Sequence, residues 1–365
     1  MAGRRVSSSE LTVDSRAKVL KVMRPIISEH LPILSLLSAF VFVVYLAEVI
    51  TGKHPAIYFV WSLLHCFTLL FVVIFLAVQI LFRVSYLRAH GVAGLAMIWE
   101  QIRKNYINLE RVTGFLLIYL AIPIFITRFS IFKQLIPHLN PFRWDEIFMK
   151  MDYVFHLGNH PWALLQPLLG YPDITWSIDI LYMLWFPVMF GIMLWMAWSG
   201  RRRLRLQFFL SFMTLWIILG ALLATIFSCA GPCYYEEVTG LKSPFNDLMA
   251  YLQQVGQVHQ LFALFNQKGL WDAYSQGVYL LFGGISAMPS MHVAGSTLFA
   301  IVGWEVGHFL GLVLTAYALI TQIGSVHLGW HYAIDGYFAA LLTFVVWKAA
   351  DRSLTFFGWR PPEQD

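Results

Sequence analysis

Long apolar runs dominate the chain and are separated by short polar or basic segments. As helices, these runs are long enough to cross the roughly 30 Å hydrocarbon core of a bilayer, although the sixth and seventh are short. The pattern therefore predicts an all-α integral membrane protein with about eight transmembrane helices, over residues 31–51, 56–82, 112–132, 174–199, 206–229, 292–306, 308–324 and 331–350.

The predicted spans divide the chain into four regions. Residues 1–30 form a basic cytoplasmic tail, 31–111 a two-helix N-terminal extension, 112–350 a six-helix core and 351–365 a second cytoplasmic tail. The charged stretch before the first apolar run is too long for a cleavable signal peptide. A plain cytoplasmic tail explains the basic residues of region 1–30, and contact with anionic lipid is the alternative.

Composition and charge support this membrane class. The chain is 59% hydrophobic and only 12% charged, whereas a soluble domain carries about 25% charged residues. The net charge of +5 does not require a nucleic-acid partner, because lysine and arginine also mark cytoplasmic loops. With both termini inside, 18 of the 25 basic residues lie on the cytoplasmic side. We expect the bacterial cytoplasmic membrane, with a Golgi or ER membrane as the alternative.

Two long segments lie on the opposite, periplasmic or lumenal side. In 133–173, apolar residues at helical spacing predict a helix in the membrane interface, which either guides a lipid or caps the bundle. The stretch 230–291 is expected to be a polar loop that is either functional or disordered. Cys229 and Cys233 have a poor spacing for a disulfide if they lie on one helix. The apolar residues at helical spacing in segment 133–173 are Trp144, Ile147, Phe148, Met151 and Phe155.

Candidate chemistry lies at predicted helix ends. His331 and Asp335 are four residues apart and share a helix face. The aspartate can fix the imidazole tautomer and leave the other ring nitrogen as a nucleophile. His292 begins another helix, where Ser290 and the backbone N–H groups of Met291 and His292 can hold an anion. His292 is then placed to protonate a leaving oxygen.

Other interpretations of these residues remain open. Helix-end histidines are often interfacial, and a His–Asp pair at this spacing is often a local contact. His292, His327, His331 and Asp335 are also ligand types that suit zinc or iron. A transporter or channel with a polar outer vestibule is a further alternative, with Asp179 and Pro187 as candidate midplane features. Their structural explanations are a satisfied interior acid and a local kink.

The segment Pro289-Ser290-Met291-His292 resembles the second signature of the type-2 phosphatidic-acid phosphatase superfamily, Pro-Ser-Gly-His. Gly324 to Asp335 resembles its third signature, Ser-Arg followed by five residues, His, three residues and Asp. The resemblance covers roughly 112–350 and implies a six-helix phosphatase-type core. It also implies that His331 is the nucleophile, that Asp335 orients it, that His292 is the proton donor, and that neither metal nor cofactor is needed.

The chain departs from these signatures at the phosphate-binding positions. Gly324-Ser325 replaces Ser-Arg, and Met291 replaces glycine. The first signature, a lysine six residues before Arg-Pro, is expected after the third core helix, where 228–235 has no basic residue. This pattern looks more like the branch that contains inositol phosphorylceramide synthase and its bacterial relatives. Phosphate binding is therefore expected from Ser290, Met291, Tyr234, Tyr235 and Lys242, with Lys268 as a further candidate.

The predicted function is that of a membrane lipid-phosphate phosphatase or phosphotransferase acting at the outer or lumenal leaflet through a phosphohistidine. Its partners would be a lipid phosphate or phospholipid, the bilayer and, in a transferase, a lipid alcohol acceptor. No nucleic acid is expected, and the sequence does not indicate an oligomeric state. A transporter, a channel or a metal-dependent membrane hydrolase remain the alternatives.

Overall fold

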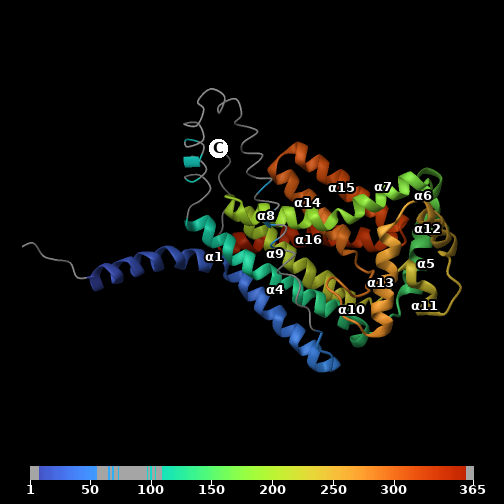
Figure 1. The fold of residues 1–365 in the computed structure, drawn as a ribbon, viewed down its shortest axis with the longest axis horizontal. Coiled ribbons are helices and arrows are strands. Elements are labelled where there is room, and N and C mark those ends of the chain that lie inside the picture. The colour runs from blue at the N-terminus through green and yellow to red at the C-terminus, as the bar shows by residue number, and fades with distance from the viewer. Residues whose placement is uncertain are drawn as a thin grey trace, which may run out of the picture.

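A computed structural model describes residues 8–55 and 109–358, together with the isolated positions 65, 68, 69, 73, 97, 99, 100 and 103. This part of the chain folds into helices and loops without a β-strand. A bundle of long helices carries a cap of short helices at one end (Figure 1). The bundle helices are α1 (Ser8–Thr51), α4 (Leu109–Leu139), α7 (Pro172–Met183), α8 (Trp185–Trp198), α9 (Arg202–Ile217) with the π-helical η1 (Ile218–Leu223) and α10 (Ala224–Ile226), α14 (Met291–Val306), α15 (His308–His327) and α16 (Ala333–Phe356).

Six helical segments of the described chain are long and apolar enough to cross a membrane. The predicted span 292–306 corresponds to α14, which is apolar but shorter than these six. The predicted span 56–82 lies outside the described residues apart from a few positions, so the total of eight is not established. The six segments are Ile27–Thr51, Arg111–Leu139, Pro172–Trp198, Arg202–Ile226, His308–His327 and Ala333–Phe356.

Helix α14 lies in the interior of the bundle. It packs against α15, α16, α9 and α8, and residues on all its faces are buried, including Ala294, Leu298, Phe299 and Val302. A helix that is apolar all round belongs in the interior of a bundle. Because His292 is in its first turn, that imidazole enters the protein core from the capped end.

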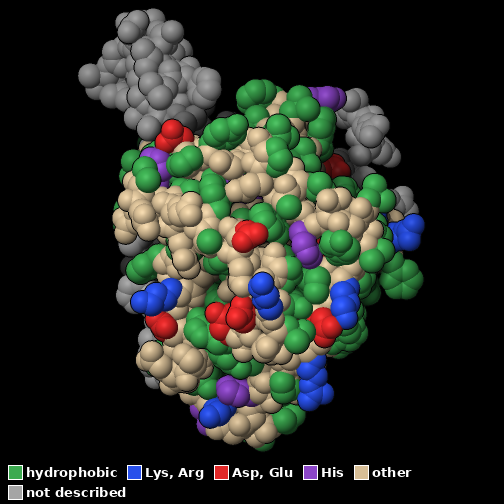
Figure 2. Space-filling model, turned by 90° about the vertical axis from the view of Figure 1, so that its right-hand side faces the viewer, with side chains coloured by type: hydrophobic (Ala, Val, Ile, Leu, Met, Phe, Trp, Pro, Cys, Tyr) green, Lys and Arg blue, Asp and Glu red, His purple; other side chains and the backbone are tan. Residues whose placement is uncertain are grey.

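The cap consists of α5 (Asp145–Phe155), α6 (Pro161–Leu169), η2 (Pro232–Tyr234), α11 (Tyr235–Thr239), α12 (Asn246–Val258) and α13 (Phe262–Gln276). The stretch 230–291 is therefore largely helical, and the expectation of a polar loop was wrong. Its apolar residues Leu248, Leu252 and Val255 are buried together with Ile178 and Tyr182 of α7. The surface at this end mixes hydrophobic, acidic, basic and histidine side chains (Figure 2).

Helix α5 is the predicted amphipathic helix, but residues 133–139 belong to α4 instead. It packs against α16 and α11 and so caps the bundle. Its buried residues are Asp145, Phe148 and Asp152, whereas Ile147, Met151 and Phe155 are exposed. The aspartates thus point into the protein and much of the apolar face points outward, which is the reverse of the usual arrangement. Cys229 and Cys233 are free thiols.

Candidate active site

The turn between α15 and α16 positions His331. The carbonyl oxygen of Ser325 accepts hydrogen bonds from the backbone N–H groups of Trp330 and His331, both at 3.0 Å. His331 Nδ1 lies 3.3 Å from Asp335 Oδ2, and the same oxygen accepts the Tyr332 N–H at 3.0 Å. The pair suggested by the four-residue spacing is therefore formed, and Asp335 is fully buried behind the ring.

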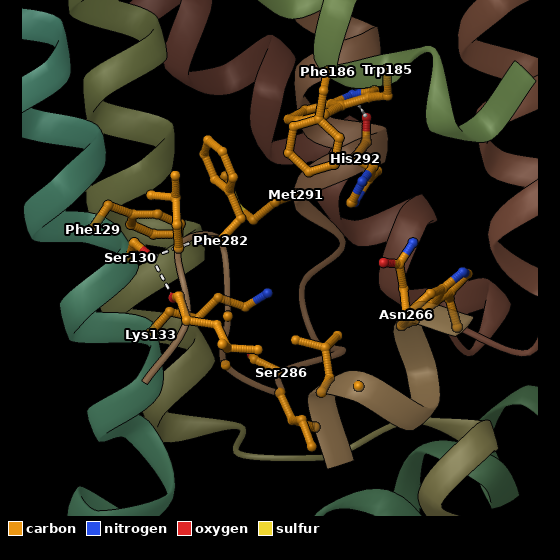
Figure 3. Close-up of a pocket in the computed structure, with 18 of the residues that line it drawn as sticks. Phe129, Ser130, Lys133, Trp185, Phe186, Asn266, Phe282, Ser286, Met291 and His292 are labelled. Carbon is orange, nitrogen blue, oxygen red and sulfur yellow. Dashed lines mark hydrogen bonds between the residues drawn. The ribbon is translucent and has the colours of Figure 1, made fainter. Parts of the chain in front are cut away.

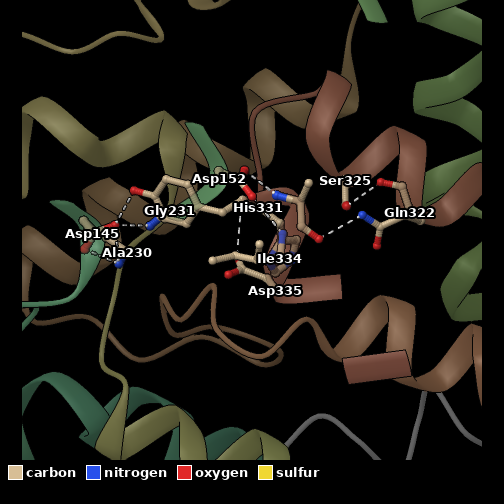
Figure 4. A network of polar contacts seen from close by, with 11 residues as sticks. Asp145, Asp152, Ala230, Gly231, Gln322, Ser325, His331, Ile334 and Asp335 are labelled. Atoms are coloured by element: carbon tan, nitrogen blue, oxygen red, sulfur yellow. Dashed lines mark hydrogen bonds and ion pairs between the residues drawn. The ribbon is translucent and has the colours of Figure 1, made fainter. Parts of the chain in front are cut away.

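Two aspartates of α5 hold the start of α16 from the cap (Figure 4). Asp152 accepts the Ala333 N–H at 2.7 Å and the Ile334 N–H at 3.0 Å, and so caps the free donors at the helix N-terminus. Burial raises the pKa of this carboxyl group, because the charged form loses water, while the backbone donors act in the opposite direction. Asp152 thereby fixes the position of the segment that carries His331.

Asp145 joins the same segment to the loop after α10. It accepts the Tyr332 hydroxyl at 2.9 Å, the Ala230 N–H at 2.9 Å and the Gly231 N–H at 2.8 Å. Burial also raises the pKa of Asp145, again against the effect of its donors. Neither aspartate was among the site residues predicted from the sequence. Their separation of seven residues, which places them on one helix face, is the signal that they act together.

His292 lies in an aromatic cage. Its ring centroid is 4.8 Å from that of Tyr182, 4.4 Å from Trp185 and 5.8 Å from Phe186. Trp185 Nε1 donates to the His292 carbonyl oxygen at 2.9 Å. Gly295 allows this close approach, since a Cβ there would lie 2.7 Å from an atom of the Trp185 ring. Packing, together with one backbone hydrogen bond, therefore sets the orientation of this histidine.

Both histidines line one cavity of about 530 Å³. The cavity also takes in Lys133 of α4, which is the only lysine or arginine among the described residues that line it. In Figure 3 the Lys133 amine and the His292 ring point into the same space. Burial first, and then the charge of Lys133, lower the pKa of His331 to about 3, against a weaker opposing hydrogen bond with the Ala287 backbone. The His331 imidazole is therefore neutral at pH 7, as a nucleophile must be.

Only some of the residues predicted to bind phosphate line the cavity. Tyr234 and Met291 line the cavity, although the Tyr234 hydroxyl already donates to the Gln267 carbonyl oxygen at 2.8 Å. Ser290 is fully buried, and its Oγ has no hydrogen-bond partner among the described residues. Tyr235 packs against Phe245 in a different cluster. The exposed Lys242 and Lys268 do not belong to the cavity lining.

Lys133 is the functional candidate that the sequence analysis missed. It is followed by six residues and then Asn140-Pro141, which is the spacing of the first phosphatase signature with asparagine in place of arginine. That signature was expected after the third core helix, whereas Lys133 lies near the end of α4. Asn140 Nδ2 donates to the Thr225 carbonyl oxygen at 2.8 Å. Ser325, at the other arginine position, donates its Oγ–H to the Gln322 carbonyl oxygen at 2.7 Å.

Met291 stands where the second signature has glycine. Its side chain has room because the residue that faces it, Gly220, has no side chain. A Cβ on Gly220, in the π-helical turn η1, would lie 2.6 Å from the Phe129 ring and 3.1 Å from Met291 Sδ. The space that a side chain at position 220 would occupy is thus filled by Phe129 and Met291. Met291 and His292, the first two residues of α14, both line the cavity.

The geometry gives little support to the two alternatives from the sequence, a metal site and a transporter or channel. Within the described residues, no group of three or more His, Cys, Asp or Glu side chains could hold a metal ion, and His327 Nε2 instead lies 2.9 Å from Thr175 Oγ1. Asp179 accepts the N–H groups of Phe262 and Ala263 at 2.6 and 2.9 Å, so it caps α13. Pro187 lies in the first turn of α8, beside the break at Leu184 that separates α7 from α8.

The fold and the cavity together define a multi-pass helical membrane protein with a cavity lined by two histidines and a lysine. Residues 146–349, more than half of the chain, match the model of the PAP2 superfamily, and the chain belongs to this superfamily. The match begins in α5 and includes both histidines and Asp335, while Lys133 precedes it. No curated protein and no solved structure matches the chain.

Proposed function

We propose that this protein is a lipid-phosphate phosphatase or phosphotransferase that works through a phosphohistidine on His331. The observation that carries the proposal is the single cavity that brings Lys133, His292 and His331 together, with Asp335 behind the nucleophile. Membership of the PAP2 superfamily implies a phosphate-ester substrate, and the surrounding transmembrane helices favour a lipid as the carrier of that phosphate.

The phosphoryl group would lie between Lys133 and the N-terminus of α14. There the Ser290 hydroxyl and the N–H groups of Met291 and His292 supply further donors, and a helix N-terminus favours an anion. Phosphoryl transfer depends mainly on positioning and on charge stabilisation. The family signatures have arginines where this chain has the uncharged Asn140 and Ser325. Lys133 would supply the positive charge in their place.

In the first step, the free ring nitrogen of His331 attacks phosphorus and the bond from phosphorus to the ester oxygen breaks. His292 gives its proton to the departing oxygen, and Asp335 stabilises the imidazolium character of His331. His292 must be protonated for this step, and the negative charge of the bound phosphate favours that form. In the second step, water or a lipid alcohol attacks phosphorus, His292 takes the proton of the attacking hydroxyl, and His331 is released.

A lipid alcohol as acceptor is favoured by the similarity to the branch that contains inositol phosphorylceramide synthase. It is also supported by Asn266 of α13, whose amide faces the cavity from the side opposite Lys133 (Figure 3). That amide can bind a hydroxyl group of an acceptor or leaving group. We propose a site facing the periplasm or a lumen, because 18 of the 25 basic residues fall on the other side of the predicted topology.

The test is to incubate the purified protein with lipid phosphates labelled at phosphorus, with and without lipid alcohols. Acid-labile, base-stable label should appear on His331 and then leave as free phosphate or as a new lipid. The His331→Ala protein should show no label, whereas His259→Ala, which changes an imidazole of the cap bound to Asp173, should label normally. Label on any other residue, or turnover without a phosphoenzyme in the folded protein, would refute the proposed mechanism.

A further inference from the structure

The cavity extends beyond the reactive residues into the bundle. On α4, Phe129 and Ile126 precede Lys133 by four and seven residues, so they lie on the same face and Ile126 is about 10 Å further from the cap than Lys133. We call this part of the cavity the inner arm. It is lined by Ile126, Phe129, Phe186, Met189, Trp216 and Phe282.

The walls of the inner arm are aromatic and its far end is closed. The Phe129 and Trp216 rings are 6.3 Å apart, and the Phe186 and Phe282 rings 5.2 Å apart. Ile126, Met189 and Trp216, which we call the floor, are 4%, 2% and 4% exposed. The arm therefore ends inside the protein.

One wall is held rigidly by polar side chains of α4. Ser130 Oγ accepts the Phe282 N–H at 2.9 Å, and Gln134 Oε1 accepts the Leu280 N–H at 2.7 Å. Phe282 has a φ of 58°, a left-handed conformation that is unfavourable for a bulky residue and persists only where its surroundings impose it. These contacts direct the Phe282 ring toward Phe186 and keep the width of the arm fixed.

We propose that the inner arm binds one hydrocarbon chain of the lipid phosphate, and that the floor sets the longest chain that is turned over efficiently. This inference rests on the proposed function, because the proposed function places the phosphoryl group between Lys133, His292 and His331. A lipid in a bilayer has its phosphate at the interface and its chains toward the midplane, and the cavity has the same order from Lys133 to Ile126.

The selectivity follows from the properties of the arm. An apolar cavity holds water poorly, so a chain is a better occupant than solvent. Moving a chain from the bilayer into the arm gains little, because lipid tails are as apolar as the lining. A chain that is too long, however, must displace side chains of a close-packed interior. The whole cavity, at 530 Å³, is of the size that holds a ligand of roughly drug size, which leaves no room for both chains of a phospholipid.

The kinetic test uses butyl, octyl, dodecyl and octadecyl phosphate with nitrophenyl phosphate as an ester without a chain. Ile126→Trp raises the floor and should lower kcat/KM for the longest chain by about tenfold or more, with nitrophenyl phosphate nearly unchanged. Met189→Ala deepens the arm and should move the optimum to longer chains. The matched control is Ile124→Trp, on the exposed face of the same helix, which should leave the profile as in the wild type. If Ile126→Trp fails to fold, Met189→Ala decides alone.

A second measurement does not need turnover. An octyl phosphate with a diazirine at the chain end, bound to full-length His331→Ala protein, should on illumination attach to Ile126, Met189 or Trp216. Attachment only at the exposed Leu120 or Ile124, or an unchanged chain-length profile in both floor variants, would overturn the inference. If the wild type turned over none of the esters, the proposed function would fail, while the attachment sites would still show where the chain lies.

Discussion

The two histidines of the cavity are held in opposite ways. His331 lies in a polar frame, in which Asp335 contacts its Nδ1 and Asp152 and Ser325 bind the backbone around it. His292 is packed among the rings of Tyr182, Trp185 and Phe186. A hydrogen-bonded frame selects one ring tautomer and one direction of attack, whereas aromatic packing fixes the position and plane of the ring without selecting a tautomer.

This difference matches two separate chemical tasks. A nucleophile has to present one nitrogen along one line to phosphorus, and directional contacts provide that. A proton donor changes between its charged and neutral forms in every cycle, and an environment without a fixed polar partner leaves that change to the bound phosphate. The comparison therefore predicts different behaviour when each histidine, or its frame, is altered.

The largest expected effect is the loss of turnover in His331→Ala for every ester, because the substitution removes the ring nitrogen that attacks phosphorus. His292→Ala should slow reaction of an alkyl phosphate by about 10²–10⁴-fold, but much less for nitrophenyl phosphate, whose leaving group needs little protonation. Steady-state rates on both esters make the comparison. Equal losses on both esters in His292→Ala would show that His292 is not the acid.

A smaller effect is expected from Asp152→Asn, which removes the charge that caps α16. A hydrogen bond to a charged group contributes about 1.5–3 kcal/mol, so activity should fall by about tenfold or more, yet less than the roughly 10⁴-fold expected of a wrong tautomer in Asp335→Asn. The loss should be the same for good and poor leaving groups, since the polar frame serves the nucleophile. Asp173→Asn, at an exposed pair of the cap, is the control. A loss in Asp152→Asn confined to poor leaving groups would contradict this division.

The smallest expected effect concerns stability against pH. Burial and Lys133 lower the pKa of His331 to about 3 in the folded protein, whereas an unfolded histidine has a pKa of about 6.5. The unfolded state then binds the extra proton, so stability present above pH 6.5 is lost as the pH falls toward 3, by about 2 kcal/mol at pH 5. Thermal unfolding in detergent at pH 7 and pH 5 measures this loss, which should be smaller in His331→Gln than in the wild type. An identical loss in both proteins would mean that His331 is not the group that titrates.

Features that depend on residues close together in the sequence could be predicted from it. Of the seven spans predicted within the described residues, six correspond to helical segments long and apolar enough to cross a membrane, and the four-residue spacing of His331 and Asp335 predicted their contact. Lys133 was missed because its signature, with Asn140 in place of arginine, lies at the end of α4, whereas it was expected after the third core helix. The inward direction of Asp145 and Asp152 on α5 could not be predicted, because the backbone donors that they bind lie more than eighty residues away.

Met291 and Gly220 have a consequence for how this site can change during evolution. The superfamily signature has its glycine at the position of Met291, the first residue of α14, and here the glycine that makes room lies on the π-helical turn η1 instead. The two positions share one volume, so neither can be judged alone. Gly220→Ala is expected to be harmful, because its Cβ would meet the Phe129 ring at 2.6 Å and Met291 Sδ at 3.1 Å, and Met291→Gly should relieve only the second of these contacts. A motif search that demands glycine in the signature would discard a chain in which the same space is reserved from the opposite helix.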